Sequence, residues 1–256
     1  MSPMATNWYI FFAGMCVGSF LNVCIYRVPS GKSIVSPASA CPVCAKPIHW
    51  YDNIPVISYI LLRGRCRNCK TRISIRYPIV EMLCGLLAMT IWMRSYAIVP
   101  ALIYFGFAAA LLVITFIDID HRIIPDIITL PGIPLGFLAS LILPELKWSD
   151  SLIGIGVGGG SLLAIAWGYR FFTGKDGMGG GDIKLLAMIG AFLGWKGVVF
   201  TIMASSLIGT LVGLILMVRA GKGIKMAVPF GPFLAMGAII HLFFGPQLMA
   251  WYWYML

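Results

Sequence analysis

Two aspartates at predicted helix ends are the side chains of this chain best placed to do chemistry. Asp118 closes one apolar stretch, and Asp182 follows Gly179 and Gly181 at the start of another. Two carboxyl groups brought close together share one proton, so an acid and a base coexist and can activate water. The glycines permit a close backbone approach, and a helix start favours an anion. Residue types alone do not show whether Asp118 or Asp120 is the partner of Asp182. They also allow a different role for these acids, as part of an ion pathway.

The other acids near these helix ends have simpler interpretations. Asp126 follows Pro125 and is predicted to be a first-turn helix residue. Asp120 beside Arg122 is typical of a solvated loop, as is Asp176.

Four cysteines form a second chemical module of two Cys-x-x-Cys pairs, 21 residues apart: Cys41 with Cys44, and Cys66 with Cys69. Each pair offers two thiolates from a tight turn, and together they complete a tetrahedral zinc site. A redox pair or two disulfides are the alternative, which a reducing cytosol disfavours. A four-thiolate shell has no open position, so the zinc is predicted to be structural and to help a small domain fold. The remaining cysteines are expected to be small buried apolar residues: Cys16, Cys24 and Cys84.

Membrane-spanning helices are the elements predicted to position these groups. The 256 residues are 60% hydrophobic and 11% charged, too few charges to coat a soluble protein. A span needs about 20 apolar residues, and eight stretches qualify: 4–26, 77–93, 97–117, 127–144, 151–170, 183–195, 197–218 and 227–247. The sixth is short and follows glycines, so a broken or re-entrant helix is expected there. We expect an all-α polytopic membrane protein with three parts: a first helix (1–27), a cytoplasmic zinc-binding insertion (28–76) and a membrane domain (77–256).

The distribution of basic residues predicts the orientation of the chain. A net charge of +10 is also typical of proteins that bind nucleic acid, but sixteen of the 19 basic residues fall in alternate loops and three in the others. Lys and Arg prefer cytoplasmic loops, so both termini are predicted to be periplasmic and no nucleic acid is expected. The first apolar stretch has no basic residue ahead of it, which favours a retained helix over a cleaved signal. Aromatic residues 251–254 (WYWY) are typical of an outer interfacial belt.

Several further motifs resemble the type IV prepilin peptidase family when taken with the cysteine module. They are residues 18–27 (GSFLNVCIYR), 50–55 (WYDNIP), 63–66 (RGRC), 75–81 (IRYPIVE) and 179–182 (GGGD, the GxGD signature of intramembrane aspartyl proteases). They occur in the family order over nearly the whole chain. A single GxGD motif is weak, whereas the combination is specific.

The resemblance implies an enzyme of the bacterial inner membrane whose catalytic pair is Asp118 and Asp182. Asp118 matches the first acid of the family pattern that ends at Pro125-Asp126. The implied reaction is cleavage of a basic prepilin leader after glycine, followed by N-methylation of the new terminus with S-adenosylmethionine. The implied partners are prepilins or pseudopilins and the lipid bilayer. Further residues are expected to bind substrate or cofactor: Asn22, Arg27, Asn53, Arg76 and Glu81.

Alternatives remain for some of these signals. Glu81 is either an ion-pair partner of Arg76 or a binding residue, and Asn22 either faces substrate or bonds between helices. Residues 154–159 (GIGVGG) satisfy a dinucleotide-binding pattern but lie in an apolar span, which favours close helix packing. The rival functions are a transporter with a proton relay and a zinc-dependent scaffold for pilus assembly. The sequence gives no indication of oligomeric state.

Overall fold

The protein is described by a computed structural model that covers all residues except 1, 96, 175–178, 221–228 and 256. The described residues contain helices and loops but no strand, and their β-type pairing is limited to the isolated bridges Ala40 to Pro47 and Arg65 to Arg72. Within these described ranges, five helices are long and apolar enough to cross a membrane, and two shorter apolar helices accompany them. The predicted all-helical, multi-pass membrane fold is therefore confirmed.

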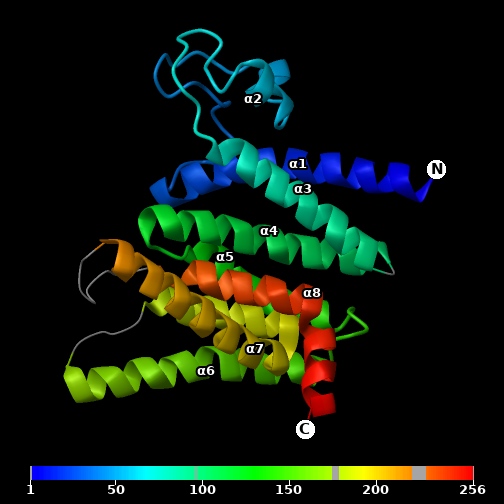
Figure 1. Ribbon diagram of the computed structural model, residues 1–256, viewed down its shortest axis with the longest axis vertical. Helices are drawn as coiled ribbons and strands as arrows, with labels where there is room; N and C mark the ends of the chain where they lie inside the picture. The colour runs from blue at the N-terminus through cyan, green and yellow to red at the C-terminus, as the bar shows by residue number, and fades with distance from the viewer. Residues whose placement is uncertain (1, 96, 175–178, 221–228, 256) are drawn as a thin grey trace. The chain divides into compact units, whose positions relative to one another are not determined.

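The chain divides into two compact units, and the first is Met1–Val113. It contains α1 (Pro3–Arg27), the short helices η1 (Val28–Ser30), η2 (Trp50–Asp52) and α2 (Ile57–Leu61), α3 (Arg76–Arg94), and the start of α4 (Ile98–His121). Helices α1 and α3 lie side by side (Figure 1). A Cβ at Gly18 would lie 2.8 Å from the Cα of Glu81, so only glycine allows this close approach.

The second unit, Ile114–Leu256, contains the end of α4 and four further helices. These are α5 (Asp126–Ser140), α6 (Trp148–Thr173), α7 (Gly180–Ala220) and α8 (Gly231–Met255). In α6, a Cβ at Gly158 would lie 2.5 Å from the carbonyl oxygen of Leu186 in α7. Gly154 and Gly158 of the 154–159 motif therefore serve close helix packing, as predicted. Ser151 adds a hydrogen bond of 2.8 Å to the carbonyl of Ala191.

A break within α7 makes this helix two segments. Its 41 residues would form a straight helix about 60 Å long, twice the hydrocarbon thickness of about 30 Å. At Gly194 the backbone leaves the helical region (φ 69°, ψ 178°), a conformation that glycine adopts at little cost. The two halves run in opposite directions (Figure 1), and a Cβ at Gly190 would lie 2.9 Å from Val198. These halves are the predicted sixth and seventh spans.

One predicted span differs in detail from the structure, and two other predictions lie outside the described residues. The fourth span ends at Ser140 rather than residue 144, because Pro144 disfavours helical backbone before it. Asp176 lies outside the described residues, as do the side chains of the aromatic run 251–254.

Candidate active site and metal centre

Asp118 lies in the last turn of α4, where its side chain is buried with 5% of its surface exposed. Its Oδ2 accepts a hydrogen bond of 3.0 Å from the backbone N–H of Gly231, the first residue of α8. The first N–H groups of a helix have no partner within the helix, so this end is suited to hold an anion. Asp120, by contrast, is exposed. The structure therefore distinguishes by burial two acids that residue types alone could not distinguish.

Asp182 lies in the first turn of α7, where its N–H donates to the carbonyl of Gly179 at 3.1 Å. Its side chain and that of Asp118 are close enough to interact electrostatically. Its Oδ1 is buried and has no hydrogen-bond partner among the described residues. Buried polar atoms are nearly always paired, so this oxygen marks a place for a water or a substrate group.

Ile124 and two glycines allow these helix ends to approach each other. A Cβ at Gly181 would lie 2.8 Å from the Cβ of Ile124, and a Cβ at Gly231 would lie 2.6 Å from Oδ2 of Asp118. The same Cβ at Gly231 would lie 3.2 Å from Cδ1 of Ile124. Gly231 was missed in the sequence analysis, although a glycine before Pro232 at a helix start was the available signal.

The remaining acid of the family pattern makes an ion pair at the surface. Asp126 begins α5, as predicted, and its Oδ2 lies 2.7 Å from Nζ of Lys184 in α7. Both side chains are substantially exposed, at 54% and 37% respectively. An exposed pair contributes at most about 1 kcal/mol, so its main effect is to join the starts of α5 and α7.

The four cysteines come together in the first unit. Their sulfur atoms all lie within 4.8 Å of one another, and the Sγ atoms of Cys41 and Cys69 are 3.7 Å apart. Tetrahedral zinc with Zn–S bonds of about 2.3 Å places its sulfurs about 3.8 Å apart. The donor set therefore fits a metal ion, and its four thiolates favour zinc in a closed structural site.

The two Cys-x-x-Cys segments fold as equivalent turns. Cys41 N–H donates to Lys46 and Cys66 N–H to Thr71, at 3.0 and 2.8 Å. Backbone N–H groups of Cys44 and Val43 lower the pKa of Cys41 to about 6. A thiol with so low a pKa is a thiolate at neutral pH, the form that binds metal.

A salt bridge connects η2 to the turn that contains Cys66 and Cys69. Arg67 Nη2 lies 2.6 Å from Oδ1 of Asp52, and Nε donates to both carboxyl oxygens. The Arg67 guanidinium lowers the pKa of Asp52 below its usual 3.8. Arg67 also lies over the ring of Tyr51, 5.5 Å from its centroid.

Glu81 is buried in α3 and joins that helix to the module. Its Oε2 accepts a hydrogen bond of 2.8 Å from the N–H of Val56, and its carboxyl also bonds with the Ser19 side chain. Val56 has φ 60°, a strained conformation for a β-branched residue. The Glu81 carboxylate therefore helps to hold this backbone in place.

The other residues expected to bind substrate or cofactor take different positions. Asn22 is buried in α1 and donates to the carbonyl of Tyr77 at 3.1 Å, which is an interhelical bond. Arg76 is the first residue of α3. Arg27 and Asn53 line one cavity between α1 and the loops of the four-cysteine module.

The expectation for the non-module cysteines is correct for one and wrong for another. Cys84 is fully buried, whereas Cys16 is exposed and lines the same cavity. Its apolar surroundings in sequence gave no hint of that cavity, because the residues opposite it come from the module.

The fold and the sites define the class as a helical, multi-pass membrane protein that has two aspartates at neighbouring helix ends and a four-cysteine module. The family model "Bacterial Peptidase A24 N-terminal domain" matches residues 12–95, and "Type IV leader peptidase family" matches residues 105–214. The chain therefore contains both parts expected of that class.

Curated relatives carry the name prepilin leader peptidase/N-methyltransferase. The Pseudomonas putida protein is 39% identical over 93% of this chain and 90% of its own length. The Aeromonas hydrophila protein is 36% identical over 95% of this chain and 92% of its own length. The Pseudomonas aeruginosa protein is 35% identical over 98% of this chain and 94% of its own length. No solved structure matches the chain significantly. The chain belongs to the type IV leader peptidase family.

Proposed function

We propose that the protein is a prepilin leader peptidase that removes the basic leader of type IV prepilins or pseudopilins after glycine. The observation that carries this proposal is the interacting pair of Asp118 and Asp182, with one buried carboxyl oxygen left without a partner in the described structure. Family membership and the names of the relatives support the same substrate class.

The proposed mechanism is acid–base hydrolysis without a covalent intermediate. Two neighbouring carboxyl groups hold one proton between them, because two negative charges so close repel each other. The carboxylate removes a proton from water as the water oxygen attacks the scissile carbonyl, and the carboxylic acid donates its proton to the leaving nitrogen. The Gly231 N–H fixes the Asp118 carboxyl at the start of α8. The unpartnered Oδ1 of Asp182 is the acceptor available to orient the water.

The second proposed activity is methylation of the new N-terminus, which the names of the relatives support. S-adenosylmethionine is the proposed methyl donor. Cys41, Cys44, Cys66 and Cys69 are proposed to hold a structural zinc ion, which would stabilise the insertion 28–76 between α1 and the membrane domain 77–256.

The proposed location is the bacterial inner membrane, with both termini periplasmic and the aspartate pair facing the cytoplasm. The bias of basic residues toward alternate loops supports this orientation. The substrate would then be a membrane-bound pilin helix that reaches the pair through the lipid.

Asparagine substitution tests the aspartate pair. Asp118→Asn and Asp182→Asn should each abolish cleavage of a purified prepilin in detergent, because neither amide can exchange the required proton. Asp120→Asn is the matched control, since this acid is exposed two residues away on the same helix. Product masses report cleavage and methylation separately. Normal cleavage by Asp182→Asn would refute the mechanism, and an uncleaved substrate with the wild type would favour the transporter or scaffold.

A further inference from the structure

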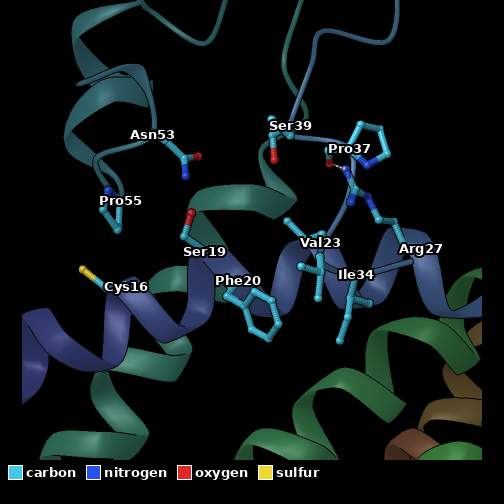
Figure 2. A pocket seen from close by; sticks show the side chains of 12 residues that line it. Cys16, Ser19, Phe20, Val23, Arg27, Ile34, Pro37, Ser39, Asn53 and Pro55 are labelled. Atoms are coloured by element: carbon cyan, nitrogen blue, oxygen red, sulfur yellow. Dashed lines mark hydrogen bonds between the residues drawn. The ribbon is translucent and has the colours of Figure 1, made fainter. Parts of the chain in front are cut away.

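A cavity of about 400 Å³ lies between α1 and the loops of the four-cysteine module. Its size is in the range of small-molecule binding sites, about 300–1,000 Å³. Residues from both sides of the cavity contribute to its lining, among them Ser19, Phe20, Val23, Arg27, Ser39 and Asn53. Figure 2 shows the Ser19 hydroxyl and the Asn53 amide pointing toward each other across it.

One end of the cavity carries a fixed positive charge. The Arg27 guanidinium donates to the carbonyl of Pro37 at 2.8 Å (Figure 2) and to the carbonyl of Ser33 at 3.0 Å. These two bonds leave three of its five N–H donors for other acceptors. A guanidinium held in this way is suited to bind a carboxylate.

The other end lies against a negative charge. Ser19 lines the cavity and bonds with Glu81, whose buried carboxylate also accepts the Val56 N–H. Ser19 and Arg27 are eight residues apart on α1, about 12 Å along the helix axis. The cavity therefore suits an elongated ligand with an anionic group at one end and a cationic group further along.

An apolar wall completes the cavity. Phe20 and Val23 of α1 contribute to it, and such side chains bind a flat heterocycle, while the Asn53 amide offers donors and acceptors to its edge. A carboxylate, a cation and a heterocycle in one extended molecule are the features of S-adenosylmethionine.

We propose that this cavity is the binding site for S-adenosylmethionine, an assignment that depends on the methylation proposed above. Arg27 holds the donor's carboxylate, and Glu81, acting through Ser19, favours its sulfonium cation. In the reaction the nitrogen of the pilin N-terminus forms a bond to the methyl carbon, while the sulfur–methyl bond breaks and its electrons remain on sulfur as a thioether. The amine releases one proton to water.

Cys16 provides a direct measure of binding, because it is exposed and lines the cavity. The full-length protein in detergent is treated with N-ethylmaleimide, and alkylation of each cysteine is followed by peptide mass spectrometry. S-adenosylmethionine at ten times its Kd should slow alkylation of Cys16 by about tenfold. Cys24, on the same helix but outside the cavity lining, should be unaffected, and adenosine triphosphate should give no protection.

Two variants connect this binding to methylation. Val23→Trp, which fills the cavity, and Arg27→Gln, which removes the carboxylate partner, should each lose protection of Cys16 and give cleaved but unmethylated pilin. Ile60→Trp is the control, because Ile60 is 65% exposed on α2 and does not line the cavity. Unprotected Cys16 in a wild type that methylates, or normal methylation by both variants, would overturn the site. A wild-type product that is cleaved and never methylated would instead overturn the methyltransferase activity, and the site with it.

Discussion

Gly231 is the position where the smallest substitution should disturb the aspartate pair most. A Cβ there would lie 2.6 Å from Oδ2 of Asp118, whereas ordinary contact begins at 3.4 Å. In Gly231→Ala the carboxyl must therefore move by about 0.8 Å, and its 3.0 Å bond to the Gly231 N–H is strained or lost. Misplacing a catalytic group by about 1 Å costs on the order of 100-fold in rate, equivalent to about 2.7 kcal/mol.

Gly180→Ala is the matched control for this substitution. Residue 180 also begins a helix next to a catalytic aspartate, but a Cβ there would have no described atom within 4 Å. Both variants introduce one methyl group at a helix start. A difference between them therefore reports the contact with Asp118 and not a general effect of alanine.

The assay is cleavage of a purified prepilin in detergent, with kcat and KM determined from product masses. For Gly231→Ala we expect kcat to fall by about 100-fold with little change in KM, because the pair acts on the reacting bond and not on the leader. A thermal unfolding midpoint close to that of Gly180→Ala would show that the fold is intact. Wild-type kcat in Gly231→Ala would refute the assignment of Asp118 as a catalytic group held by α8.

Two other predictions concern the four-cysteine module. Cys44→Ser should lose bound metal and reduce methylation more than cleavage, because a structural site with three thiolates binds zinc poorly. Metal analysis and product masses measure both effects, with Cys24→Ser as the control. A full zinc content in Cys44→Ser would contradict the prediction. Asp52→Asn should lower the thermal stability of the module, since it removes the salt bridge to Arg67. Because Arg67 lowers the pKa of Asp52 below 3.8, the stabilisation is complete above that pH and disappears as the pH falls through the lowered value. The loss measured by thermal unfolding should therefore be constant between about pH 5 and 8, and a loss that varies over that range would contradict the assignment.

Sequence patterns predicted the helices and the four-cysteine cluster well, because both are marked by neighbouring residues. A membrane span is recognised by a continuous apolar stretch, and a four-thiolate site by the spacing within each cysteine pair. Neither feature depends on distant parts of the chain. The sequence separated the two halves of α7 as the spans 183–195 and 197–218, and the backbone angles identify Gly194 as the residue at which the helix breaks.

The choice between Asp118 and Asp120 was beyond sequence patterns without the family resemblance. Residues two apart on a helix point about 200° away from each other, so one acid is buried while the other is exposed. Which of the two faces inward depends on how the end of α4 packs against the other helices of its unit. That packing involves Gly231, which is 113 residues away in the chain.

The sequence by itself determined that this is a multi-pass membrane protein with a four-thiolate module and acids at its helix ends, because hydrophobicity and ligand spacing are carried by neighbouring residues. Only the tertiary structure decided that Asp118 is held by the start of α8, that Glu81 holds the backbone of Val56, and that Arg27 and Asn53 line one cavity. These are contacts between segments distant in the chain, and helix packing and loop geometry create them.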